Sequence, residues 1–175
     1  MKEHFTRKHK GFTLVELLIV IVVIGILSAM MMLSSSEAVS SAKATAIISD
    51  LRNLKTAALA YFADHADTWM TKKMDNKMTE INIDDVLPYL NGKDFPSKKS
   101  YKVVSSNDGQ AWYVQCSIAG DDPVVKGTEQ AAIKKKLAGR AKSVGLLYRR
   151  QNPSETPIYY DGTTESGNYV VMLVQ

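Results

Sequence analysis

Glu16 is an ionisable residue inside an apolar run. The run extends from Phe12 to Leu33 in the stretch KGFTLVELLIVIVVIGILSAMMML, and it is long enough to cross a bilayer. A carboxylate is costly in such a segment, so an intramembrane acidic residue is a candidate for a specific function. We therefore expect Glu16 to have a dedicated partner.

The other acidic residues and the histidines form no convincing catalytic site. His65 stands near Asp64 and Asp67, where the alternatives are a metal site and a solvated helix end. Asp161 and Glu165 could offer oxygen ligands to calcium, but no dense run of Asp and Asn surrounds them. We expect no enzyme activity, no metal and no cofactor.

Cysteine usage and net charge narrow the function classes further. Cys116 is the only cysteine, so an intramolecular disulfide is excluded. The net charge is +4, but residues 1–11 hold four basic residues and one acidic residue, which leaves +1 on the remaining chain. This balance gives little electrostatic support for nucleic acid as the main partner.

One predicted helix is nevertheless strongly basic. The alternatives for it are a solvated face and a contact with DNA, with an anionic surface or with an acidic neighbouring subunit. No aromatic residues are interleaved with the charges, so a platform for single-stranded nucleic acid is not indicated. The basic residues are Lys134, Lys135, Lys136, Arg140 and Lys142, with Arg149 and Arg150 beyond them.

The apolar run has the dimensions of a membrane span. Its 22 residues would extend about 33 Å as a helix, close to the thickness of the hydrocarbon core. The basic residues in front of it predict a cytoplasmic N-terminus. A secretory signal peptide is the alternative, but such signals have a shorter apolar core followed by a small-residue cleavage site.

The stretch KGFTLVELLIVIVVIGILSA resembles the N-terminus of type IV prepilins and their pseudopilin relatives, over about residues 10–33. In that family a membrane-embedded aspartyl peptidase cuts after the last Gly of a basic leader, and the new N-terminal residue is N-methylated. The resemblance implies cleavage between Gly11 and Phe12, methylation of Phe12 and a role for Glu16 in subunit assembly. The other matching residues are Thr13, Leu14, Leu17 and Gly25.

The sequence departs from the family at one point. Many pilins carry a proline near the end of the apolar run, and this chain has none there. Gly25 is therefore the one obvious weak point of the predicted helix.

The helical pattern continues beyond the apolar run. Apolar residues recur at steps of three and four from Val39 to Phe62, and neither Pro nor Gly occurs between Ile26 and Asp67. The first half of this helix is apolar all round and the second half has one apolar stripe, so the halves need different surroundings. The predicted parts are a leader (1–11), a transmembrane and polymerisation helix (12–34) and a globular domain (35–175) in which 35–67 continues the helix.

The remaining sequence predicts mixed structure. We expect a short helix at 84–90, a hairpin of SYKVVSS and QAWYVQCSI around the turn NDG, and a second helix at 128–142 with Thr128 as N-cap. At least two of VGLLYRR, TPIYYDG and NYVVMLVQ should be strands. The predicted fold class is α+β, with the long helix packed on an antiparallel sheet of about four strands, and the resemblance implies the same pilin-like fold.

The resemblance implies a structural subunit of a type IV pilus-like fibre, polymerised through its N-terminal helix. Its expected partners are prepilin peptidase, an assembly ATPase with its membrane platform protein, other pilin subunits and the membrane. Its expected location is the bacterial cytoplasmic (inner) membrane as a single-pass precursor, then an extracellular or periplasmic fibre. Two alternatives stay open, namely a pseudopilin of a type II secretion system and a minor DNA-binding pilin for DNA uptake.

Overall fold

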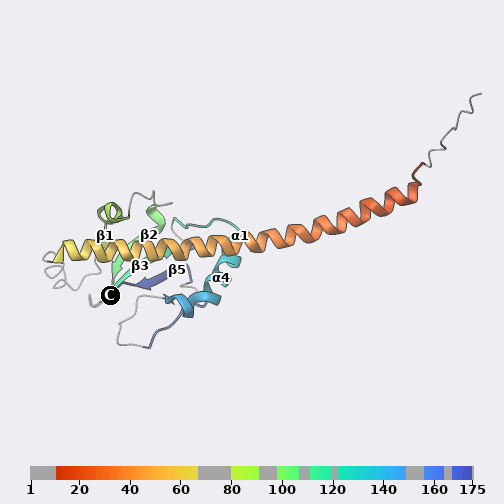
Figure 1. The fold of residues 1–175 in the computed structure, drawn as a ribbon. Coiled ribbons are helices and arrows are strands. Elements are labelled where there is room, and N and C mark those ends of the chain that lie inside the picture. The colour runs from red at the N-terminus through yellow and green to blue at the C-terminus, as the bar shows by residue number, and fades with distance from the viewer. Residues whose placement is uncertain are drawn as a thin grey trace, which may run out of the picture. The chain divides into compact units, whose positions relative to one another are not determined.

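The long helix predicted at the N-terminus is present as α1 (Leu14–Asp64). The computed structural model describes residues 11–66, 80–90, 98–106, 111–119, 122–148, 156–163 and 167–174 (Figure 1). The expected helix end at Asp67 lies outside these residues. The chain divides into two compact units, Met1–Ala38 and Val39–Gln175, and α1 contributes residues to both. The expected domain boundary between Ser34 and Ser35 stays a prediction.

The described residues of the second unit form an antiparallel sheet of five strands in the order β1-β2-β3-β5-β4. The α+β prediction is therefore confirmed, with one strand more than the expected four. The unexpected strand is β1, whose two residues are too few for a period-two pattern to reveal it in sequence. VGLLYRR contains β4 and NYVVMLVQ contains β5, so the expectation of at least two strands in the C-terminal segments is confirmed. The strands are β1 (Glu80–Ile81), β2 (Tyr101–Ser105), β3 (Trp112–Ser117), β4 (Leu146–Leu147) and β5 (Tyr169–Leu173).

The predicted hairpin is formed by β2 and β3. Tyr101 pairs with Cys116 and Ser105 pairs with Trp112, while the predicted turn NDG lies outside the described residues. Because side chains alternate along a strand, Val103 and Val104 point to opposite faces of the sheet. The two residues accordingly belong to two separate apolar clusters.

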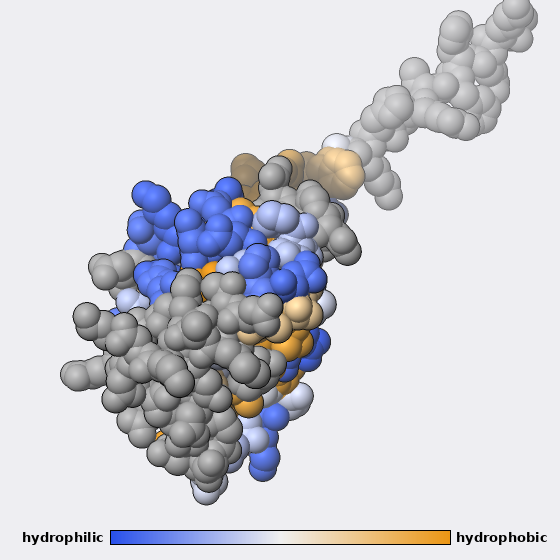
Figure 2. Space-filling view, turned by 90° about the vertical axis from the view of Figure 1, so that its left-hand side faces the viewer, coloured by the Kyte–Doolittle hydropathy of each residue, from blue (hydrophilic) through white to orange (hydrophobic). Residues whose placement is uncertain are grey.

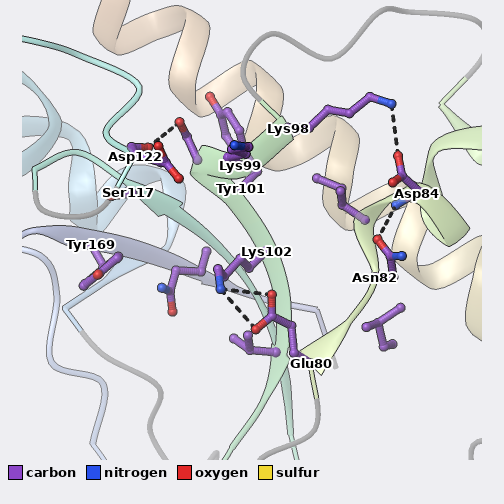
Figure 3. Close-up of a pocket in the computed structure, with 15 residues that line it drawn as sticks. Glu80, Asn82, Asp84, Lys98, Lys99, Tyr101, Lys102, Ser117, Asp122 and Tyr169 are labelled. Carbon is purple, nitrogen blue, oxygen red and sulfur yellow. Dashed lines mark hydrogen bonds and ion pairs between the residues drawn. The ribbon is translucent and has the colours of Figure 1, made fainter.

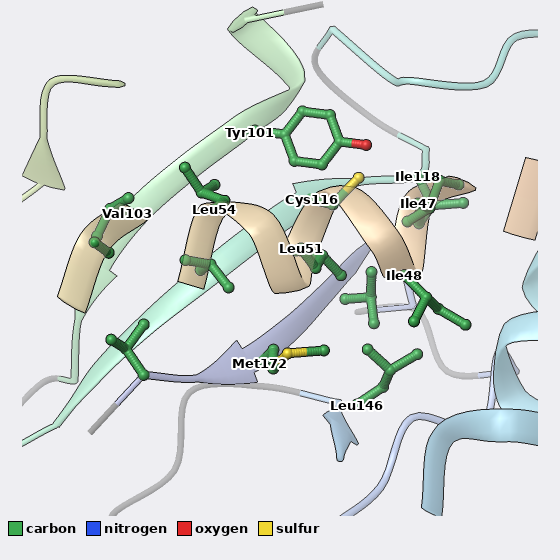
Figure 4. Packing of buried hydrophobic residues seen from close by; sticks show 14 of the residues in the cluster. Ile47, Ile48, Leu51, Leu54, Tyr101, Val103, Cys116, Ile118, Leu146 and Met172 are labelled. Atoms are coloured by element: carbon green, nitrogen blue, oxygen red, sulfur yellow. The ribbon is translucent and has the colours of Figure 1, made fainter. Parts of the chain in front are cut away.

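The main core lies between α1 and one face of this sheet (Figure 4). Leu51 and Leu54 of α1 are fully buried and lie beside the side chains of Val103 and Cys116. The spacing of three and four residues places the buried side chains of α1 on one stripe of the helix, as predicted. The buried apolar residues of this stripe are Ala44, Ile47, Ile48, Leu51, Leu54, Ala57, Ala58 and Phe62.

Two local predictions need correction. The short helix expected at 84–90 is an α-helical turn, α3 (Ile83–Val86), followed by the 3₁₀ helix η1 (Leu87–Tyr89). Pro88 has no backbone N–H, so it cannot continue the α-helical hydrogen bonding. Thr128 does stand at the N-cap of α4 (Glu129–Val144), but its side chain makes no capping hydrogen bond. Its φ and ψ of −66° and −17° are helical, whereas a capping side chain usually needs an extended backbone.

A segment at residues 156–163 extends the sheet edge beyond β4. Tyr159 forms a single antiparallel bridge with Leu147, so TPIYYDG contributes a bridge rather than a strand. Gly162 then passes against α4, where a Cβ would lie 3.0 Å from the Lys134 carbonyl oxygen, and its φ is +74°. Glycine is needed at this position by both its φ and the close approach.

A chain truncated to begin at Ser36 should be soluble, monomeric and folded, with a circular dichroism spectrum of mixed α and β type. In α1 the buried residues begin at Ser40 and the buried apolar ones at Ala44, both within the truncated chain, and the exposed apolar side chains between Phe12 and Met31 would be absent. The described atoms on the face drawn in Figure 2 are mostly hydrophilic. Aggregation or an unfolded spectrum at moderate concentration would contradict the two-part interpretation of α1.

Candidate processing and assembly site

The N-terminal end of α1 is closed by two polar side chains. Thr13 precedes the first helical residue, and its Oγ1 accepts a hydrogen bond from the Glu16 backbone N–H at 3.2 Å. In return Glu16 Oε2 accepts bonds from the Thr13 backbone N–H at 2.8 Å and from Thr13 Oγ1 at 2.9 Å. This reciprocal arrangement is a capping box, which satisfies backbone donors that a helix start would otherwise leave unpaired.

The capping box gives Thr13 a role that the sequence analysis did not assign. In the sequence, Glu16 is evident by its charge, whereas Thr13 stands out only as a match to the family motif. The available signal was the spacing itself, because Thr or Ser three residues before Glu at the start of an apolar run is typical of a capping box. Within the single chain, the Glu16 carboxylate is therefore already hydrogen-bonded.

The two residues at the expected cleavage point are open to an external partner. Phe12 is 88% exposed. A Cβ added to Gly11 would meet no atom of the described residues within 4 Å, so none of these neighbours requires glycine there. A requirement for glycine at this position would point to a molecule that binds the segment.

The segment that follows is apolar and uncovered. The large apolar side chains between Phe12 and Met31 are between 48% and 88% exposed. In the part of the chain that the structure describes, α1 is the one helix long and apolar enough to cross a membrane. The helix runs through Gly25 without interruption. An exposed surface of this kind needs lipid or other apolar helices around it.

The basic helix predicted at 128–142 is α4, and its packing separates the five basic residues into two groups. The Arg140 guanidinium donates from Nη1 to Thr45 Oγ1 at 2.6 Å and from Nη2 to Ser41 Oγ at 3.1 Å. Lys134 Nζ donates to Asn168 Oδ1 at 3.3 Å. These two residues therefore hold α4 against the rest of its own unit. The other three, Lys135, Lys136 and Lys142, are exposed or half-exposed.

An ion pair also joins α4 to α1. Lys43 Nζ is paired with the Glu129 carboxylate at the start of α4. Both side chains are nearly half exposed, so solvent screens this pair and its contribution to stability is small. Arg140 makes the more directional contact, because its planar guanidinium bonds two hydroxyls at once.

An open groove of about 880 Å³ lies beside the β1 edge of the sheet (Figure 3). Its charges neutralise one another, since Lys98 pairs with Asp84 at 3.0 Å and Lys102 with Glu80 at 3.0 Å. The lining also holds Lys99 and Asp122, one charge of each sign. The groove therefore presents no surplus of buried charge that would select an ion or a charged substrate.

The acidic residues considered for metal binding are used in local hydrogen bonds. Asp64 Oδ2 accepts from the Tyr89 hydroxyl at 2.8 Å, and His65 Nδ1 lies 3.0 Å from the Tyr61 carbonyl oxygen. Asp161 Oδ1 accepts from the Thr163 backbone N–H at 3.0 Å. Asp67 and Glu165 lie outside the described residues. Among the described residues, no group of three or more His, Cys, Asp or Glu side chains could hold a metal ion.

Cys116 is a core residue of β3. Its side chain is fully buried, and this burial raises the pKa of the thiol to about 12. The reactive form of cysteine is the thiolate, so the side chain stays an inert thiol at neutral pH.

The comparisons with known proteins concern the N-terminal part of the chain. A family model described as "Prokaryotic N-terminal methylation motif" matches residues 6–32. The match includes the expected cleavage point, the capping box and most of the apolar run. No curated protein matches the chain, and no solved structure does either.

Replacing Arg140 by alanine should lower the free energy of unfolding of the second unit by about 1–2 kcal/mol, because a charged donor loses two hydroxyl acceptors. The measurement is thermal or urea unfolding, with Lys142→Ala as the matched control. Lys142 lies exposed on the same helix, so its loss should change the stability by about 0.5 kcal/mol or less. Equal effects of both changes would show that the contacts of Arg140 contribute nothing.

Proposed function

Because residues 6–32 carry the type IV pilin and pseudopilin signal, we propose that the protein is a structural subunit of a type IV pilus-like fibre. One observation carries the proposal. A Gly-Phe junction, a capping box around Glu16 and an uncovered apolar helix follow one another within the matched residues. The signal marks pilin-type proteins, which are processed by prepilin peptidase and assemble with other pilin subunits.

The proposed life of the subunit has two stages. The precursor is held in the bacterial cytoplasmic membrane by a single span, residues 12–34, with its basic leader in the cytoplasm. Prepilin peptidase cuts after Gly11, and the new amine of Phe12 is methylated. An assembly ATPase and its membrane platform protein then add the subunit to an extracellular or periplasmic fibre, with residues 35–175 on the outside.

Glu16 supplies the register of the proposed fibre. Cleavage creates a charged amine on Phe12, and Glu16 lies four residues further, about 6 Å along the helix. In a staggered bundle, the Phe12 amine of a neighbouring subunit can reach this carboxylate. Opposite charges attract more strongly in a low dielectric than in water, so the pair favours one axial offset between helices. The apolar side chains around it supply most of the contact.

A type II secretion pseudopilin is the second candidate function, because the matched motif is shared by pilins and pseudopilins. A minor DNA-binding pilin has less support. Of the five basic residues proposed for such a contact, Arg140 and Lys134 already bond within the unit. Imaging the native fibre and identifying its main chain by mass distinguishes a surface pilus from a secretion pseudopilus.

Replacing Gly11 by valine should leave the precursor uncut and in the membrane. No atom of the described residues lies within 4 Å of a Cβ at this position, so a loss of processing would report the peptidase cleft. Intact-mass analysis of the membrane fraction is the measurement, and Gly25→Ala, where the space is also open, is the control expected to be cut normally. A mature species that starts at a residue other than Phe12 would overturn the cleavage assignment.

Replacing Glu16 by alanine should allow insertion and cleavage but strongly reduce entry into fibres, because the register contact is lost. Glu16→Lys should be worse, since it would place two positive groups together. The measurement compares sheared fibres with the membrane pool for each variant. Glu37→Ala, which removes an exposed carboxylate beyond the apolar run, should assemble normally. Normal fibres from Glu16→Ala would contradict the register role.

A further inference from the structure

The side of α4 that faces away from the core is positively charged. The helix holds five basic residues and one acidic residue, and the acidic one, Glu129, is paired with Lys43. Lys135, Lys136 and Lys142 have no ion-pair partner among the residues that the structure describes. Small residues such as Ala132 and Gly139 lie between them, so the three ammonium groups can approach a flat surface together.

The contacts of α4 tie this helix to a particular part of α1. Arg140 bonds Ser41 and Thr45, and Glu129 pairs with Lys43. Ser41, Lys43 and Thr45 are among the first residues of the second unit, which begins at Val39. Ser41 stands eight positions after Leu33, the last residue of the apolar run, and α1 is helical throughout that stretch. The tether is therefore about 12 Å long.

This tether is short compared with the reach of a membrane surface. The headgroup region adds about 5–7 Å to each side of the hydrocarbon core, and the field of anionic lipids extends about 8–10 Å further at physiological salt. We propose that Lys135, Lys136 and Lys142 dock on anionic phospholipid headgroups of the membrane that holds the apolar run. This inference rests on the proposed membrane-anchored precursor.

Lipid is a better match than nucleic acid for a patch of this size. Each lysine close to an anionic surface strengthens binding about fivefold, so three give about a hundredfold. Such a gain is small for a free partner, but the tether makes the encounter intramolecular, with an effective concentration in the millimolar range. Moreover, α4 has no aromatic residue on which a base could stack.

The docking would also depend on whether the apolar run of the subunit is still in the membrane or has already left it. The contact is strong only while the apolar run keeps α4 close to the lipid. Once the run leaves the membrane, the effective concentration is lost and the three lysines return to solvent. The docked form would therefore favour the subunit that waits in the membrane.

The full chain, with a fluorescent probe on Ala132→Cys, is reconstituted into vesicles of phosphatidylcholine with or without phosphatidylglycerol. Cys116 is buried, so it stays unlabelled. Quenching by a headgroup spin label should be several-fold stronger with phosphatidylglycerol and should be lost at high salt. A probe at the exposed Thr56 of α1 should show no such change.

The lysines themselves are tested by two matched triple variants. Lys135→Gln, Lys136→Gln and Lys142→Gln together should abolish the lipid-dependent quenching. Lys55→Gln, Lys98→Gln and Lys99→Gln, which change the net charge equally, should retain it. An inserted chain without lipid-dependent quenching at position 132, or equal loss in both variants, overturns the docking.

Two further results would also overturn it, and they separate the inference from the proposed function. If Lys135, Lys136 and Lys142 are needed for salt-dependent binding of duplex DNA while the probe stays unquenched, the patch is a nucleic-acid surface. Insertion is checked by protection of the apolar run from protease. A chain that does not insert would overturn the membrane anchorage, and with it both proposals.

Discussion

The structure depends on one constraint, which is that the first half of α1 has no cover of its own. Fifteen large apolar side chains between Phe12 and Met31 are exposed. Moving them out of water would contribute on the order of 20 kcal/mol, because each buried side chain of this kind contributes about 1.5–3 kcal/mol. A single ion pair at an effective dielectric of about 20 contributes about 4 kcal/mol. The burial of apolar surface therefore supplies most of the free energy that favours placing this helix in lipid or in a helix bundle. The charged residues contribute less and favour one arrangement within it.

The capping box explains how a carboxylate can stay in such a helix. The Glu16 oxygen that accepts from Thr13 also completes the helix start, so the acidic group is not left without hydrogen bonds in a single chain. A neighbour's amine must compete with these bonds. A capping interaction contributes about 1 kcal/mol, less than a well-placed pair of opposite charges in a low dielectric. In the proposed fibre, the exchange is favourable only when the offset between helices brings the amine close, which makes the contact selective for register.

Long elements with a clear period could be predicted from the sequence, whereas elements defined by their neighbours could not. The stripe of α1, the β2–β3 hairpin and α4 each carry their own pattern over many residues. The two-residue strand β1 exists because β2 is beside it, and no local signal marks it. Strand β4 was expected within VGLLYRR, but only two of its residues pair with β5. The same distinction holds at the candidate sites. Glu16 was evident as a charge among apolar residues, but the internal role of Arg140 depends on the packing of α4 against α1.

The boundary of the core within α1 connects the fold to the proposed function. The first buried apolar residue of the helix is Ala44, and the apolar side chains before it whose burial the structure describes are exposed. A subunit that passes from a membrane to a fibre changes everything around residues 12–34. If the sheet had packed against that half of the helix, each transfer would have disrupted the core of the domain. Because the core begins only at Ala44, the surroundings of the apolar half can change while the contacts between α1 and the sheet stay the same.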